Sequence, residues 1–403
     1  MLLIFLCWLV YACSYLGKIN YTANIIRIEN YYSITHSQAG LVSTMFFFAY
    51  GIGQVVNGLL CKKYNLKWMV AGSLTLSALV NLVVGAIDNF AIIKYVWLIN
   101  GFSMSILWPS LIRLLSETIS KKDMAKASVI MGTTVATGTF IIYGLSALLA
   151  KLSFKIIFYI AAGVLGVVCV IWLLLVSGFV KNAKATEAEE EKMQAAQTSV
   201  SQDKSAGKGV LLFMIVALGV YGVFTNFISD GLTTWVPSIL KEQYSLDDSL
   251  SIILTLFLPV VSIFGNVFAV SIHKKVPNFV MQCALVFVSA GAIIGLVIAG
   301  LSLGQFIITL IGFAIVRFLV GSNNSLITSI FPLFMKGKIN SGLIAGILNG
   351  CCYVGSTISS YGLGTLADRF GWNAVFWLLF SVCIAAGVLA VVYKIIERIK
   401  NKG

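Results

Sequence analysis

The chain has 403 residues, of which 59% are hydrophobic and only 11% charged, and its mean hydropathy is +0.95. Soluble domains carry about 25% charged residues, so this composition excludes an ordinary water-soluble protein and indicates a chain surrounded by lipid. The net charge of +13 is spread over the connecting segments and not over a soluble module, which argues against a nucleic-acid partner.

Apolar segments recur along the whole chain at the length of about 20 residues that a helix needs to cross a bilayer. The expected spans of the N-terminal part are 2–28, 37–61, 68–87, 90–118, 127–150 and 155–179. Those of the C-terminal part are 210–240, 249–272, 278–301, 304–335, 339–366 and 373–393. We therefore predict an all-α membrane protein with 12 transmembrane helices. A polar linker, 181–209, would separate two six-helix bundles, 1–180 and 210–403.

The basic residues are distributed unevenly between the two ends of these spans. Of the 28 Lys and Arg residues, 19 face one side and 6 face the other. By the positive-inside rule the richer side is cytoplasmic. The distribution predicts a multi-pass protein of the cell (inner) membrane, with both termini and the linker in the cytoplasm.

Residues that carry enzymatic or metal chemistry are not gathered in any one place. The eight cysteines are scattered through the spans without a Cys-x-x-Cys pair. The histidines, His36 and His273, fall in loops on opposite sides of the membrane. Neither a nucleophile–base pair nor a phosphate-cradling glycine loop is found. We expect no enzyme, no metal site and no cofactor.

An internal repeat relates the two bundles. Residues 143–159, YGLSALLAKLSFKIIFY, resemble residues 361–377, YGLGTLADRFGWNAVFW, without gaps. Chance likeness of two apolar segments is the alternative, but the polar loop and the aromatic positions agree as well. The repeat joins spans five and six to spans eleven and twelve with the same direction. The bundles are then parallel, pseudo-symmetric repeats, as in the major facilitator fold.

Four segments carry a resemblance to a particular family. Span one contains YLGKINYTANI, span four has Trp108, Pro109 and Arg113, and span seven contains DGLTTWVPSIL. Span eleven and the loop after it match the family pattern at Gly342, Gly346, Tyr353, Gly355, Ser356, Gly362, Asp368, Gly371, Trp372 and Phe376. The chain is thereby similar to the organophosphate:phosphate antiporters, the glycerol-3-phosphate and hexose-phosphate carriers of the major facilitator superfamily.

The resemblance implies a secondary active transporter that works by alternating access, with Lys18 at the family's substrate-binding arginine. Three positions depart from the family pattern. Its second phosphate-binding arginine falls on Ser229, its lysine of span two falls on Gln54, and its histidine of span five has no counterpart in 130–140. A sugar phosphate, a glycerol phosphate and a sugar acid therefore all remain open as substrates.

Charged side chains inside the predicted spans need a reason, because each costs about 2.5–3.5 kcal/mol at the helix centre on insertion scales. Lys18 lies in span one and Arg317 in span ten, both of which line the central pathway in this fold. Our hypothesis is a two-cation clamp on an anion, with Arg317 replacing the cation missing at Ser229. Asp230 would pair with one cation in the empty site. The alternatives are a snorkelling Lys18 and a structural ion pair of Arg317.

Other residues are candidates for substrate contacts or gating. Arg113 and Glu117 are one helical turn apart in span four, which suits a gate or conformational lock. Polar side chains are expected to shape specificity, and each is equally compatible with helix–helix contact. They are Asn20, Tyr21, Gln54, Asn323 and Tyr353.

The leading interpretation is thus a monomeric carrier whose partners are a small-molecule organic anion and the lipid bilayer. In the N-terminal spans the acids Glu29 and Glu117 lie near the span ends, and the one deeper acid, Asp230, also lies toward the outer end of its span. The lack of a carboxylate in the N-terminal cavity favours anion exchange over proton symport. Two alternatives stay open: a transport-deficient membrane sensor of a phosphorylated metabolite, and a carrier or efflux protein for a neutral substrate.

Overall fold

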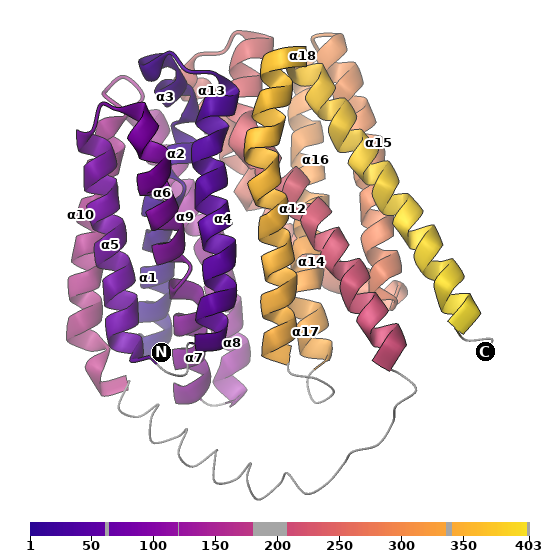
Figure 1. The fold of residues 1–403 in the computed structure, drawn as a ribbon, viewed down its shortest axis with the longest axis horizontal. Helices are drawn as coiled ribbons and strands as arrows, with labels where there is room; N and C mark the ends of the chain where they lie inside the picture. Colours follow the sequence, from indigo (N-terminus) through magenta and orange to yellow (C-terminus); the bar gives the residue numbers. More distant parts are fainter. Residues whose placement is uncertain (61–63, 120, 180–207, 336–340, 401–403) are drawn as a thin grey trace, which may run out of the picture.

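The computed structural model describes residues 1–60, 64–119, 121–179, 208–335 and 341–400, and every regular element among them is a helix. The helices form two groups that stand side by side in Figure 1, α1–α10 in indigo to magenta and α12–α18 in crimson to yellow. We call these groups the N-terminal and C-terminal halves. The predicted linker, 181–209, lies outside the described residues except for its last two positions, which belong to α12.

The N-terminal half contains three of its predicted spans, the first, fourth and fifth, as broken or paired helices. Its elements are α1 (Leu2–Lys18), α2 (Asn20–Ala23), α3 (Ile25–Tyr32), α4 (His36–Leu60), α5 (Leu66–Ala86), α6 (Phe90–Met104), α7 (Leu107–Thr118), α8 (Lys121–Gly132), α9 (Thr134–Leu148) and α10 (Lys155–Leu175). The first span is interrupted at Ile19 and Asn24, whose backbone ψ angles of 5° and 15° leave the helical region. This interruption places Lys18 at the end of a helix inside the half.

The C-terminal half repeats this plan with longer helices. Its elements are α12 (Lys208–Tyr244), α13 (Asp248–Thr255), α14 (Phe257–Lys275), α15 (Phe279–Ser302), α16 (Phe306–Ser325), a π-helical turn η3 (Leu326–Ile330), α17 (Phe331–Phe334) and α18 (Ser341–Lys400). Within α18 the chain bends at Gly371, whose φ of 75° and ψ of 175° are not helical. The bend separates predicted spans eleven and twelve.

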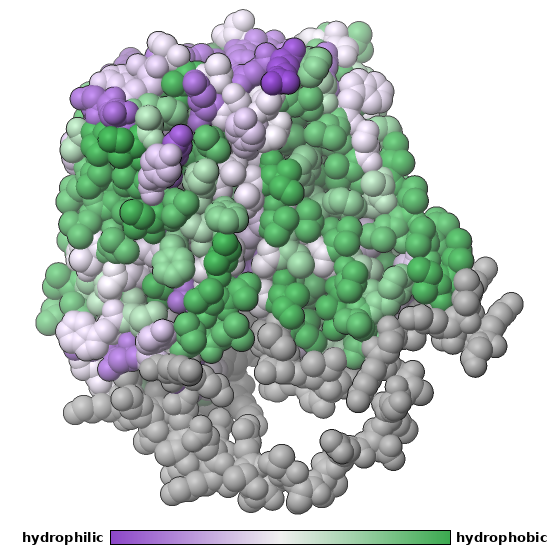
Figure 2. Space-filling view, viewed as in Figure 1, coloured by the Kyte–Doolittle hydropathy of each residue, from purple (hydrophilic) through white to green (hydrophobic). Residues whose placement is uncertain are grey.

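The predicted fold class, an all-α membrane protein, is confirmed. Ten described helices are long and apolar enough to cross a membrane, and Leu2–Lys18 is a shorter apolar helix. One of the ten, Ile344–Ile396, includes the bend at Gly371 and makes two crossings. With the shorter helix this agrees with 12 spans. Figure 2 shows hydrophobic residues over the middle of the visible face and hydrophilic ones gathered near α3 and the bend of α18.

The two ends of the molecule differ in how the halves meet. At the end that we call the linker end, α1 begins, α10 ends and α12 begins (Figure 1). From there α12 and the last part of α18 converge on the rest of the molecule toward the opposite end. The halves touch through α4 against α18, α9 against α13 and α14, and α3 against α12.

We expect Gly371→Ala to lower the stability of the detergent-purified protein by about 1–3 kcal/mol, because the Gly371 backbone conformation is essentially restricted to glycine. The measurement is the apparent melting temperature. Gly362→Ala in the same helix is the control, since an added Cβ there meets nothing within 4 Å. Equal melting temperatures for both variants would show that the bend is not strained.

Candidate functional site

Lys18 lies in a cage of tyrosine rings at the end of α1, with only 7% of its surface exposed. Its ammonium nitrogen is 3.9 Å from the ring centroid of Tyr50, 5.0 Å from that of Tyr15 and 5.9 Å from that of Tyr353. Tyr50 belongs to α4 and Tyr353 to α18, so both halves contribute rings. Cation–π attraction compensates part of the hydration that the ammonium loses. Lys18 forms no ion pair within 4 Å in the described part of the chain.

Arg317 of α16 reaches the same region from the C-terminal half. Its Nη1 donates a hydrogen bond of 2.5 Å to Ser229 Oγ on α12. Its Nε is buried without a hydrogen-bond partner among the described residues. The guanidinium therefore lies beside Ser229, the position at which the family pattern has its second arginine. Its Nε–H remains available as a donor.

Asp230 belongs to α12, where it follows Ser229, the hydrogen-bond partner of Arg317. Its Oδ2 accepts hydrogen bonds from Ser356 Oγ at 2.5 Å and from Asn226 Nδ2 at 3.4 Å. The carboxylate lies close enough to interact electrostatically with both Lys18 and Arg317. It makes no direct ion pair with either within 4 Å, as far as the described residues show. We call Lys18, Asp230 and Arg317 the charged triad.

A hydrogen-bond chain fixes the carboxylate of the triad to the surrounding helices. Asn226, which bonds Asp230, accepts from Asn324 Nδ2 of α16 at 3.3 Å. Tyr143 of α9, which interacts electrostatically with Arg317 and Asp230, donates to the backbone oxygen of Thr233 at 3.2 Å. The triad is thus held at the seam between the two halves by α12, α16, α18 and α9.

Four of the polar residues singled out in the sequence form hydrogen bonds within one half, to residues outside the triad. Asn20 bonds Asn81 at 2.7 Å, Tyr21 bonds the Ala39 oxygen at 3.0 Å, Gln54 bonds the Ser105 oxygen at 3.3 Å and Asn323 bonds the Cys283 oxygen at 3.3 Å. All four are buried helix–helix contacts. The structure brings together Lys18, Asp230, Arg317 and Tyr353.

Arg113 and Glu117 form the expected ion pair one turn apart on α7, and both side chains are largely buried. Sequence reasoning did not select the rings of Tyr15 and Tyr50 around Lys18. A signal for Tyr15 was present, because a residue three positions before Lys18 on a helix shares its face. Tyr50 lies on a different helix, and no local pattern connects it with Lys18.

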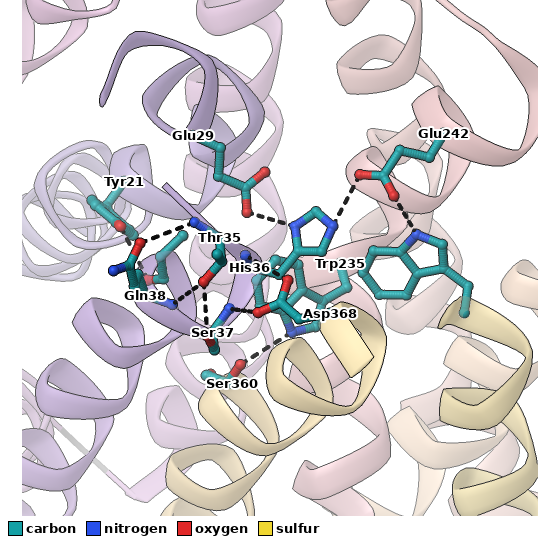
Figure 3. A network of polar contacts seen from close by, with 12 residues as sticks. Tyr21, Glu29, Thr35, His36, Ser37, Gln38, Trp235, Glu242, Ser360 and Asp368 are labelled. Atoms are coloured by element: carbon teal, nitrogen blue, oxygen red, sulfur yellow. Dashed lines mark hydrogen bonds and ion pairs between the residues drawn. The ribbon is translucent and has the colours of Figure 1, made fainter. Parts of the chain in front are cut away.

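The end opposite the linker end is closed by a network around His36, the first residue of α4 (Figure 3). Its Nδ1 is 2.9 Å from Glu29 Oε1 in the same half, and its Nε2 is 3.0 Å from Glu242 Oε1 in the other half. Trp372 Nε1 donates to the second oxygen of Glu242 at 2.8 Å. Two ionised carboxylates need donors on both ring nitrogens, so this arrangement suits a protonated imidazole.

Asp368 of α18 closes the same end by capping α4 from the other half. Its two oxygens accept from the backbone nitrogens of His36 and Ser37 at 3.0 and 2.8 Å. The first backbone N–H groups of a helix have no partner inside it, and a carboxylate there also favours the helix dipole. The cap therefore joins the two halves by satisfying groups that would otherwise need water (Figure 3).

Two glycines let α4 and α18 approach closely beside this network. A Cβ on Gly40 would lie 2.3 Å from the Ser360 oxygen, and one on Gly364 would lie 2.7 Å from the His36 oxygen. The indole of Trp235 fills the space between these glycines and donates to the Ser360 oxygen at 3.2 Å. A cavity of about 480 Å³ opens beside the network and is lined in part by Glu29, His36, Lys241, Glu242 and Asp368. We call this end the closed end.

The chain belongs to the Major Facilitator Superfamily, which matches residues 7–360. This is a family of transporters, so the expectation that the protein is not an enzyme is confirmed. The human sugar phosphate exchanger 3 is 20% identical over 390 residues, covering 85% of this chain and 78% of the relative. The glycerol-3-phosphate transporter of Bacillus subtilis is 23% identical over 392 residues, covering 93% and 88%.

The fold agrees with this family. The structure of the xylose transporter XylE from E. coli aligns with a TM-score of 0.71 at 10% identity and covers 96% of this chain and 97% of that one. The predicted resemblance to the organophosphate carriers is confirmed at the level of distant homologues.

We expect Gly40→Ala to separate the halves at the closed end, because the added methyl group overlaps a backbone atom that cannot rotate away. Pulsed electron paramagnetic resonance between spin labels at Leu152 and Leu303, exposed in turns of the two halves, should report a longer distance. Gly72→Ala, with open space around its Cβ, is the control. An unchanged distance distribution would contradict the close packing.

His36→Gln should also favour opening of the closed end, since Glu29 and Glu242 would lose the cation between them. The same pair of labels measures the effect. Gln38→Ala is the matched control, because the Gln38 side chain accepts from the backbone of Thr35 in its own turn and joins no residue of the other half among those described. If both variants keep the wild-type distance, the imidazole does not hold the halves together.

Proposed function

We propose that this secondary transporter carries a small organic anion across the cytoplasmic membrane by alternating access. The observation that supports it is the position of the triad: Lys18 and Arg317 approach one place from opposite halves. Within the described part of the chain, Lys18 has no ion-pair partner and the Nε of Arg317 has no hydrogen-bond partner. An anion that accepts from both would draw the halves together, and charge-assisted hydrogen bonds are about twice as strong as neutral ones.

Candidate substrates are a sugar phosphate, a glycerol phosphate and a sugar acid. The distant relatives named for sugar phosphates and glycerol-3-phosphate support the phosphorylated classes. The position of Arg317 beside Ser229 supports the relocated clamp, because the guanidinium reaches the place of the missing cation. Tyr353 would add a ring and a hydroxyl from α18 to the same site.

The orientation that we propose places the linker end and both termini in the cytoplasm, as the excess of Lys and Arg on that side suggests. The closed end would then face outward. Residues 1–180 and 210–403 would act as two bundles that rock around the triad, in a monomer. Arg113 and Glu117 would act as a gate on the cytoplasmic side, and the coupling would be anion exchange.

The test measures the melting temperature of the detergent-purified protein with glycerol-3-phosphate, hexose phosphates and sugar acids, each beside its neutral parent. We expect stabilisation by an anion of this set, and its loss in Lys18→Gln and in Arg317→Gln. Lys94→Gln is the control, because Lys94 stacks on Tyr95 away from the triad.

Uptake of the stabilising compound into proteoliposomes then separates a carrier from a sensor, which would bind without accumulation. Stabilisation by neutral compounds alone, unaffected by the two triad variants, would reject the anion as substrate and leave the transporter family standing.

A further inference from the structure

We propose that Asp230 makes the site select an anion with a single negative charge, such as a sugar acid, over a doubly charged phosphate monoester. This inference rests on the proposed function and names its substrate class. The observation behind it is the place of Asp230 between contacts of the two clamp cations. Asp230 follows Ser229, which accepts a hydrogen bond from Arg317, and it accepts one from Ser356. Ser356 is one turn from Tyr353 on α18, and the Tyr353 ring lies 5.9 Å from the Lys18 ammonium.

The charges of the triad sum to one positive charge, since Lys18 and Arg317 each contribute one and Asp230 removes one. The neighbours that hold the triad are neutral side chains: Tyr15, Tyr50, Tyr143, Tyr353, Asn226, Ser229 and Ser356. Arg113 and Glu117, both on α7, form an ion pair with each other, so their charges cancel. A singly charged ligand therefore brings the site to neutrality, whereas a doubly charged one leaves an excess negative charge.

An excess charge in the triad site is energetically costly because the charged groups are buried among helices. The interaction between two charges grows as the effective dielectric falls from that of water toward that of the protein interior. A buried charge without a counter-charge is strongly unfavourable. A second negative charge on the ligand would also lie near the carboxylate of Asp230, where like charges repel.

The hydrogen bonds around Asp230 keep its carboxylate in place when a ligand arrives. Ser356 of α18 and Asn226 of α12 both donate to Oδ2. Because the carboxylate makes no direct ion pair among the described residues, the ammonium of Lys18 and the Nε of Arg317 keep donors for the ligand. Asp230 thus sets the charge of the site without occupying it.

The experiment compares ligands that share a carbon skeleton and differ in charge: glucuronate with glucose 6-phosphate, and glycerate with glycerol-3-phosphate. Binding to the full-length, detergent-purified protein is measured at about pH 8, where a phosphate monoester with a second pKa near 6 is doubly charged. We expect the wild type to bind the carboxylate of a pair more tightly by roughly tenfold, and Asp230→Asn to reverse the preference by a similar factor. Asp248→Asn is the control, since Asp248 pairs with Lys241 outside the triad and its loss should leave the ratio unchanged.

The wild-type ratio is decisive by itself, so the inference remains testable if Asp230→Asn is not recovered in folded form. A wild type that prefers the phosphate in both pairs overturns the role of Asp230, and so does a folded Asp230→Asn with the wild-type ratio. Either result leaves the anion carrier in place, because anions still bind. Absence of binding by all four ligands instead overturns the proposed function, and the inference with it.

Discussion

The cost of holding charge inside a membrane is the constraint on which the rest of this structure depends. Lys18, Asp230 and Arg317 lie in membrane-spanning helices, and none can be left alone in an apolar surrounding. Asp230 and Arg317 both belong to the C-terminal half, and Lys18 joins them because the two halves meet there. Tyrosine rings surround Lys18, and the hydroxyl groups of Ser229 and Ser356 form hydrogen bonds with Arg317 and Asp230. The seam is therefore stabilised by the same groups that would bind a ligand.

The closed end shows how the seam is sealed on one side of the triad. There, contacts between the halves use backbone groups and buried polar atoms: Asp368 caps α4, Glu242 bonds His36 and Trp235 fills the space between two glycines. These contacts include several hydrogen bonds, which water can replace when the halves separate. Such a seal suits a protein whose halves part and close during a transport cycle.

Local sequence patterns predicted the spans well and the interruptions poorly. The length of the apolar segments was enough to locate the helices. It did not predict the break at Ile19 or the division of spans four, five and eight into two helices each, because the sequence stays apolar across these points. The candidate polar residues illustrate the same difficulty. Asn20 and Tyr21 follow Lys18 closely in the chain, yet they turn into contacts with α5 and α4, since the break of the helix changes their direction.

The sequence by itself determined the all-helical membrane fold, the family and the two buried cations, because hydropathy, charge and the repeat are properties of single segments. Only the tertiary structure decided that Asp230 comes within electrostatic reach of both Lys18 and Arg317, and that Tyr50 and Tyr353 enclose the lysine. It also decided that His36, a lone histidine in the sequence, bridges two carboxylates from different halves. These are contacts between residues up to 335 positions apart, and they depend on how the helices cross.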